Sequence, residues 1–123
     1  MPKYSKDHMW VKEEEGRARV GISDFAQREL GEIAFIELPN EGSCVEAGNP
    51  VCSIDSLKST SDVYAPISGK IVKINSLLTE QNNTSFINKE PLGQGWLFII
   101  EIENQEQIDS LLTEEEYEKY ISE

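Results

Sequence analysis

Histidine occurs once in this sequence and cysteine twice, so the chain has few of the side chains that bind transition metals. An enzyme also needs acid, base or nucleophilic groups that converge, and the sequence has no GxSxG motif and no glycine-rich phosphate loop. Cys44 and Cys52 form no CxxC pair, and two cysteines are too few for a disulfide framework. We therefore expect two reduced, packed thiols, no catalytic residue and no metal site.

Long apolar segments are also missing. The longest apolar run, Trp96–Ile100, is far too short to cross a bilayer. The first residues lack the apolar core of a secretory signal and the Arg- and Ser-rich character of a transit peptide. A length of 123 residues, with 38% hydrophobic and 28% charged side chains, fits one globular domain. We expect a single domain over residues 1–123 in a cytoplasmic protein.

Basic residues are scarce. Eleven Lys and Arg residues face 23 Asp and Glu residues, which gives a net charge of −12. Nucleic acids and anionic membranes bind surfaces with clustered Lys and Arg, so neither is expected as a partner. The charge is uneven, because residues 101–123 hold nine acidic residues against Lys119 alone. This balance permits protein partners that present basic docking surfaces.

The sequence does contain many short segments with strand character. Polar and apolar residues alternate in several of them, and turn residues such as Pro39, Gly42 and Gly48 separate them. Seven short strands with little helix predict a β-sandwich or barrel-like domain. The expected strands are Met9–Lys12, Arg17–Ile22, Ile33–Leu38, Val51–Ile54, Asp62–Ala65, Lys70–Asn75 and an alternating segment with Trp96, Phe98, Ile100 and Ile102.

Two short helical regions are expected as well. Ser23 is a good N-cap for a helix that Gly31 would end. Thr113 and Glu116 have the spacing of a capping box, which predicts a helical tail at about residues 105–121. Residues 82–85 are expected to form a polar loop.

The most informative residue is a lysine between two predicted strands. Lys58 is the only basic residue between Arg28 and Lys70, in a window that holds seven acidic residues. A lone lysine at a hairpin tip is accessible and presents one amine to a modifying enzyme. Asp55 and Asp62 bracket it as candidate recognition contacts for that enzyme. Composition alone still favours a solvated turn lysine.

A family resemblance changes that balance. Residues Asp55–Gly69 closely resemble the lipoylation hairpin of glycine cleavage H proteins. The resemblance runs from about Tyr4 to Tyr120, nearly the whole chain. Several blocks at the right spacing carry it, which is a far stronger signal than any one of them. The further blocks are His8–Val11, Val20–Gln27, Leu30–Ile33, Phe35–Pro39, Ile87–Asn88 and Pro91–Leu97.

The resemblance implies a mainly β fold of barrel-sandwich hybrid type, with a lipoylation hairpin at about residues 51–67 and lipoate amide-linked to Lys58. It implies a non-enzymatic carrier that accepts an aminomethyl group from glycine decarboxylase (P protein). The carrier delivers that group to aminomethyltransferase (T protein), and dihydrolipoamide dehydrogenase (L protein) reoxidises the arm. A lipoyl ligase or octanoyltransferase would attach the lipoate, with Asp55 as a recognition contact.

Three residues depart from the family pattern. Asp55, Met9 and Leu92 stand where the family usually has Glu, Glu and Tyr. The Glu at the Met9 position is expected to help hold the charged aminomethyl group, and a thioether brings no charge. Met9 therefore favours an alternative role, in which the chain is an H-protein-like lipoyl carrier or lipoate relay that serves 2-oxoacid dehydrogenases. On this basis Met9→Glu is expected to improve the aminomethyl steps.

Two further alternatives are weaker. A biotin carrier would usually have Met on both sides of the modified lysine, but Leu57 and Ser59 flank Lys58. A pure interaction module predicts no modification of Lys58 at all.

Overall fold

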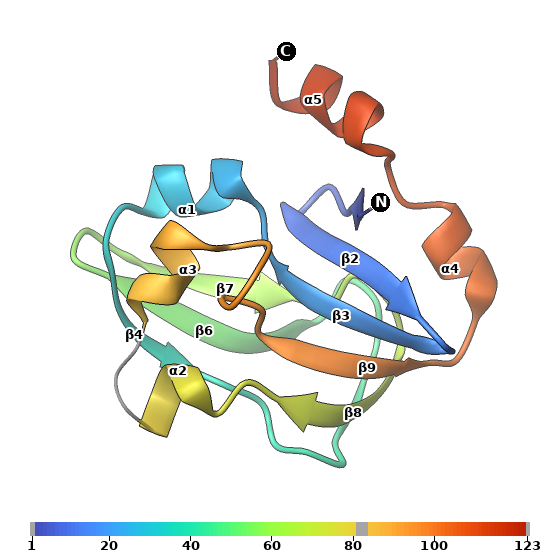
Figure 1. The fold of residues 1–123 in the computed structure, drawn as a ribbon. Helices are drawn as coiled ribbons and strands as arrows, with labels where there is room; N and C mark the ends of the chain where they lie inside the picture. The colour runs from blue at the N-terminus through green and yellow to red at the C-terminus, as the bar shows by residue number, and fades with distance from the viewer. Residues whose placement is uncertain (1, 81–83, 123) are drawn as a thin grey trace.

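The computed structural model describes residues 2–80 and 84–122 as two antiparallel sheets with short helices around them (Figure 1). The larger sheet has the strand order β1-β2-β3-β9-β8-β5, and the smaller one has the order β4-β6-β7. The strands are β1 (Lys3–Tyr4), β2 (Met9–Glu14), β3 (Arg17–Ile22), β4 (Ile33–Glu37), β5 (Cys44–Val45), β6 (Pro50–Ser56), β7 (Thr60–Tyr64), β8 (Gly69–Ile74) and β9 (Phe98–Ile102).

The helices lie around the sheets. In Figure 1, α1 and α3 lie near each other above the small sheet, and α5 stands beyond the N-terminal strands. Within the described part of the chain, no helix has the length and apolar character needed to cross a membrane. The helices are α1 (Asp24–Leu30), α2 (Leu77–Glu80), α3 (Ser85–Lys89), α4 (Gln105–Asp109) and α5 (Glu114–Ser122).

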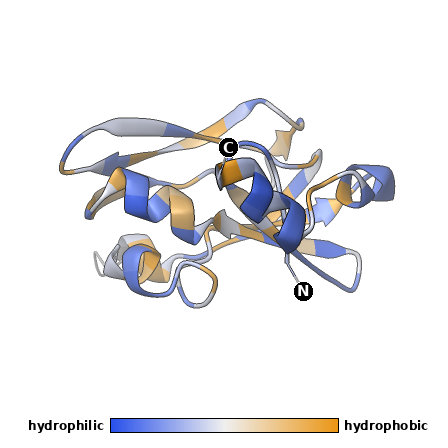
Figure 2. Cartoon of the chain, turned by 90° about the horizontal axis from the view of Figure 1, so that it is seen from above, coloured by the Kyte–Doolittle hydropathy of each residue, from blue (hydrophilic) through white to orange (hydrophobic). Residues whose placement is uncertain are grey.

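One apolar core joins the two sheets. Val20 and Ile100 of the large sheet and Ile36 and Ile54 of the small sheet belong to the same buried cluster. Each of these side chains is at most 1% exposed. Hydrophobic and hydrophilic residues are interspersed along the strands, and the helices carry hydrophilic residues on their outer faces (Figure 2). The paired sheets with short helices, including a C-terminal helix, confirm the predicted fold class.

A second, smaller cluster attaches the C-terminal helix. Tyr4 of β1, Trp10 of β2 and Tyr117 of α5 are all buried in it. The rings of Tyr4 and Tyr117 stack with centroids 4.3 Å apart. Trp10 donates its ring N–H to the Pro91 carbonyl at 2.7 Å. The stacked rings attach α5 to β1, and the Trp10 bond attaches β2 to the segment that follows α3.

Most of the predicted strands are confirmed, with boundaries that shift by a few residues. The last predicted strand begins later than expected: β9 starts at Phe98, and Trp96 lies outside it. Leu97, directly before the strand, is fully buried. The side-chain amide of Asn75 donates to the carbonyls of Gln94 and Trp96, so these carbonyls do not join the sheet ladder. The short strands β1 and β5 were not predicted, because two residues carry no periodic pattern.

The predicted helix ends are confirmed. The Ser23 hydroxyl accepts a hydrogen bond from the Ala26 amide at 3.1 Å. In the tail, the Thr113 amide donates to Glu116 at 2.9 Å and the Glu116 amide donates to Thr113 at 3.2 Å. These bonds hold the pKa of Glu116 below its usual value. The predicted tail is split into α4 and α5 rather than continuous.

Two other expectations need correction. The polar loop expected at 82–85 falls partly outside the described residues, and Ser85 begins α3 instead. Cys44 is exposed, so it is not a packed thiol. Cys52 is partly buried, and burial raises the pKa of its thiol to about 12. The Cys52 thiol therefore stays protonated and unreactive near neutral pH.

Candidate functional site

The β6–β7 hairpin presents Lys58 at its tip. The strands pair as far as Asp55 with Thr60, and the connection projects beside the turn between α1 and β4 (Figure 1). Lys58 and both of its neighbours are exposed, which confirms the predicted position. The ion pairs within the described residues are Lys12–Glu14 and Arg28–Asp24, so they leave the Lys58 amine free.

Ser56 organises the backbone of this tip. Its hydroxyl accepts from the amides of Lys58 at 3.2 Å and Ser59 at 3.1 Å. The same hydroxyl donates to the Ser59 carbonyl at 3.1 Å. Sequence reasoning assigned Ser56 no role, although serine two residues before the apex of a connection is a common turn signal. Ser56 thus holds Lys58 on a defined turn rather than on a loose loop.

The tip is also tied to the body of the protein. The Leu57 amide donates to the Glu32 carbonyl at 3.0 Å. Asn88 of α3 holds the residues on either side of Glu32: its amide nitrogen donates to the Gly31 carbonyl at 2.8 Å, and its oxygen accepts from the Ile33 amide at 2.9 Å. Asn88 therefore fixes the turn at residues 31–33, and this turn holds the hairpin tip through the Glu32 carbonyl.

The side chain of Lys58 crosses Gly31 at the end of α1. A Cβ on Gly31 would lie 2.8 Å from Lys58 Cε and 3.4 Å from Nζ. The carboxyl end of a helix carries partial negative charge, which suits a nearby ammonium group. Gly31 has a φ of 80°, a left-handed conformation that favours glycine. Gly31 thus both ends the helix and makes room for the lysine.

Gly31→Ala is expected to destabilise the protein by about 1–2 kcal/mol, because an L-residue is strained at this φ. It should also displace the Lys58 stem and so slow any modification of the amine. Denaturant unfolding and the modification rate measure the two effects. Gly42→Ala is the matched control: Gly42 has a φ of 90° but nothing within 4 Å of the added Cβ. Equal modification rates for both variants would contradict a role for the Gly31 contact.

A groove begins next to Gly31: Leu30 lines it, whereas Gly31 and Lys58 are not among its described lining residues. Its volume of about 380 Å³ falls in the range of small-ligand pockets. It runs between α1 and β7 and ends at the segment that leads into β2. Its lining residues are Lys6, Asp7, His8, Met9 and Ile22, then Phe25, Ala26, Glu29 and Leu30 of α1, and Ile54 with Ser61–Tyr64 of the hairpin.

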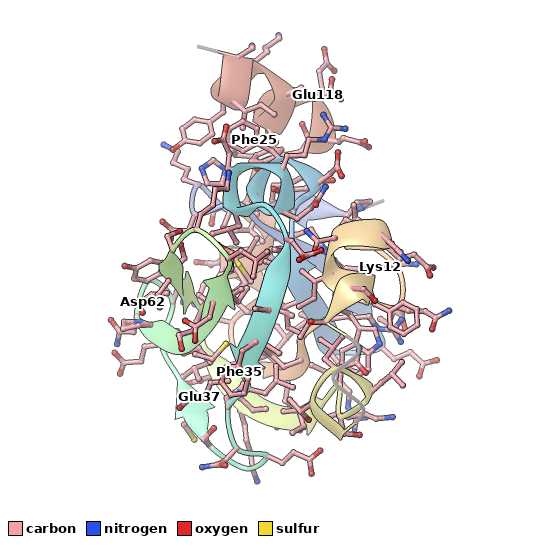
Figure 3. The ribbon with its side chains drawn as sticks, turned by 90° about the vertical axis from the view of Figure 1, so that its left-hand side faces the viewer. Lys12, Phe25, Phe35, Glu37, Asp62 and Glu118 are labelled. Atoms are coloured by element: carbon pink, nitrogen blue, oxygen red, sulfur yellow. The ribbon has the colours of Figure 1, made fainter. Side chains whose placement is uncertain are left out.

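The charged residues of the groove are mostly acidic. Asp7, Glu29 and Asp62 line it, and Lys6 is the one basic residue among the described lining residues. Figure 3 views the molecule from the hairpin side, with Asp62 on β7 and Phe25 at the start of α1. Such a lining favours a cation at its polar positions and an apolar chain along the rest. Asp62, taken from the sequence as a recognition contact, lies in the groove.

His8 stands at the far end of the groove in an unusual conformation. Its φ of 68° lies in the left-handed region, which costs a non-glycine residue about 1–3 kcal/mol. Ser5 supports this turn, since its hydroxyl accepts from the amides of Asp7 at 3.3 Å and Met9 at 3.2 Å. His8 Nδ1 lies 2.8 Å from the Tyr117 hydroxyl. The partner of His8 is thus Tyr117, which lies in the same cluster as Trp10.

The residues that depart from the family pattern lie in different places. Met9 is 1% exposed and lines the groove as part of the apolar core. Asp55 accepts a hydrogen bond from the Thr60 hydroxyl at 2.7 Å on the hairpin surface. Leu92 is exposed and lines a separate hollow next to α5. Only Met9 therefore bears on the groove.

A free lysine on a fixed hairpin tip, next to a ligand-sized groove on a two-sheet β fold, defines the class of swinging-arm carrier domains of barrel-sandwich hybrid type. The profile of the family described as "Glycine cleavage H-protein" matches residues 2–123. The chain belongs to the glycine cleavage H-protein family.

Individual relatives agree with this assignment. A glycine cleavage system H protein of Coprothermobacter proteolyticus is 46% identical over 122 residues, which are 98% of this chain and 94% of that protein. One of Halalkalibacterium halodurans is 44% identical over 121 residues, or 98% and 93% of the two chains. The crystal structure of a glycine cleavage system H protein from Mycobacterium marinum matches with a TM-score of 0.88 and 32% identity, covering 99% of this chain and 97% of that one. These findings support the glycine cleavage role over the lipoate relay.

Proposed function

We propose that the chain carries lipoate on Lys58 and serves as the non-enzymatic carrier of the glycine cleavage system. The observation that supports this most directly is the free Lys58 amine on a fixed tip beside a groove. The partners would be glycine decarboxylase, aminomethyltransferase and dihydrolipoamide dehydrogenase. The relatives named above are bacterial and both cysteines are unpaired, which fits a cytoplasmic, reducing setting.

The groove fits a lipoyl arm in length and in chemistry. From Gly31 to Phe25 along α1, six residues at 1.5 Å each span about 9 Å. The acyl chain and ring that lipoate adds to a lysine extend about 10 Å, given carbon–carbon bonds near 1.5 Å. Phe25, Ala26 and Leu30 of α1 provide half-buried apolar surface along this path, and the buried Ile54 and Val63 also line it. An arm that starts at Lys58 therefore reaches the His8 end of the groove.

The lipoyl group, when attached, supplies the redox and group-carrying chemistry. The chain's own residues supply presentation and shelter. Ser56 and Gly31 set where the arm leaves the surface. Asp7, Glu29 and Asp62 would hold a cationic amine, and the apolar lining limits its contact with water. With no catalytic residue proposed for this chain, bond making and breaking belong to the partner enzymes.

Reconstitution tests this function. The lipoylated protein should support glycine-dependent CO₂ exchange by glycine decarboxylase, and the unmodified protein should not. A parallel assay should find no transfer of lipoate to 2-oxoacid dehydrogenases. Efficient transfer without CO₂ exchange would favour the relay instead.

Asp55 is proposed as the contact by which the modifying enzyme recognises the hairpin. It lies on the last strand pair before the tip, and the Thr60 hydroxyl orients its carboxylate. The second carboxylate oxygen remains available to a basic group on the enzyme. This arrangement suits the acidic surroundings of the hairpin, since Asp62 lies on β7 and Glu37 lies on the neighbouring strand β4.

Asp55→Ala is expected to lower kcat/KM for lipoylation by about tenfold or more, since a contact to a charged group contributes about 1.5–3 kcal/mol. Asp55→Glu should preserve or raise the rate with a ligase adapted to Glu. Asp55→Asn keeps the shape and the Thr60 bond, so it isolates the charge. Timed peptide mass spectrometry measures each rate. Equal rates for all four proteins would place recognition elsewhere.

A further inference from the structure

The C-terminal helix reaches the far end of the groove through one hydroxyl. The Tyr117 hydroxyl lies 2.8 Å from His8 Nδ1 and 2.7 Å from the Ser23 hydroxyl. The Ser23 hydroxyl accepts in turn from the Ala26 amide at 3.1 Å. The result is a chain of hydrogen bonds from the first turn of α1, through α5, to the one histidine of the protein.

The directions of these bonds follow from counting protons. Ser23 is 1% exposed, so its hydroxyl proton needs an acceptor within the protein. Within the described residues the recorded partner that can accept it is Tyr117. The Tyr117 hydroxyl must then donate its own hydrogen bond to His8 Nδ1. Nδ1 is the acceptor, so the neutral imidazole carries its proton at Nε2. Burial raises the pKa of Tyr117, so its hydroxyl keeps the proton that this arrangement needs.

His8 therefore has one polar atom left to offer to the groove that it lines. Nδ1 is occupied by Tyr117, and no hydrogen bond to Nε2 occurs among the described residues. An Nε2–H group is a donor, so it cannot bind an ammonium group, which is also a donor. The groove carboxylates suit the ammonium. The donor at His8 suits an acceptor, and sulfur is the acceptor at the end of a lipoyl arm.

We propose that His8 donates a hydrogen bond from Nε2 to a sulfur of the docked arm, and that Tyr117 is the positioning residue that sets the tautomer and orientation of His8. This inference rests on the proposed lipoyl function. It explains why His8 keeps a strained left-handed backbone, since strained residues persist where surrounding contacts hold them for function. It also gives the C-terminal helix a role at the carrier site.

The tautomer is tested first, on the unmodified protein. Because the chain has one histidine, long-range ¹H–¹⁵N NMR correlations of its imidazole carry no overlap. We expect the Nε2–H tautomer in the natural protein and a mixture in Tyr117→Phe, which keeps the stacking on Tyr4. Tyr120→Phe is the matched control: its hydroxyl donates to the Lys6 carbonyl and not to His8. An Nδ1–H tautomer in the natural protein, or no change in Tyr117→Phe, overturns the proposal.

The contact with sulfur is tested by two acyl arms of similar length on Lys58. Dihydrolipoyl-Lys58 should shift the His8 Nε2 resonance, whereas octanoyl-Lys58, which lacks sulfur, should not. The loaded carrier should also lose its cargo about three- to tenfold faster in Tyr117→Phe, as expected for loss of a neutral hydrogen bond. Lipoylated Lys58 with unmoved His8 resonances overturns this inference alone. Failure of all ligases to modify Lys58 overturns the proposed function and this inference with it.

Discussion

Lys58→Arg should abolish lipoylation and with it all carrier activity. Arginine keeps the positive charge and the length of the side chain, but its guanidinium does not form the amide bond that a ligase makes with an amine. The fold should survive, because an exposed residue without an ion pair contributes less than about 0.5 kcal/mol to stability. Thermal unfolding should therefore match that of the natural protein, while glycine-dependent CO₂ exchange falls to background.

Lys70→Arg and Lys73→Arg are the controls for this loss. Both lysines lie on β8 in the large sheet, away from the hairpin tip. Both variants should be lipoylated and active. Residual carrier activity in Lys58→Arg, or loss of activity in either control, would contradict Lys58 as the attachment site.

Neutralising the acidic residues of the groove should produce the second largest loss. The combined change Asp7→Asn, Glu29→Gln and Asp62→Asn removes every acidic side chain among the groove's described lining residues. Each lost contact to a charged amine costs about 1.5–3 kcal/mol, so the loaded arm should be destabilised at least ten- to hundredfold. Glycine-dependent CO₂ exchange and the lifetime of the loaded carrier measure this loss. The step of dihydrolipoamide dehydrogenase, which acts on the uncharged dithiol or ring, should stay unchanged.

The single variants show which carboxylate matters most. A comparable loss of the dihydrolipoamide dehydrogenase step would indicate a general defect rather than loss of a cation site.

The presence of Asp7, Glu29 and Asp62 in this groove also lowers the gain in the aminomethyl steps that is expected from Met9→Glu. Met9 is 1% exposed within the apolar core, and a fourth carboxylate there would lie partly among apolar neighbours.

The sequence predicted the elements that have a strong local pattern. Polar and apolar residues alternate at the start of β3, the charged turn after β2 separates the two strands, and Ser23 and Gly31 are local helix signals. Lys58 could be identified because its isolation and its flanking block are both visible in the sequence. The family was recognised from blocks along nearly the whole chain.

The elements that were missed depend on tertiary contacts. Helix α3 is five residues long, and Asn88 and Thr84 fix it through bonds to residues around Gly31 and Ile33. A helix this short has no local periodicity from which it could be predicted. The groove could not be predicted either, because it forms only when α1, β7 and the segment before β2 meet. The Tyr117–His8 contact joins residues 109 positions apart.

The most direct test of the account is peptide mass spectrometry of the protein after incubation with an active lipoyl ligase, lipoate and ATP. The account predicts the lipoyl mass increment on the peptide that contains Lys58, and unmodified peptides for Lys70 and Lys73. An unmodified Lys58 peptide with several ligases that modify other carriers, or lipoate on another lysine, would contradict it.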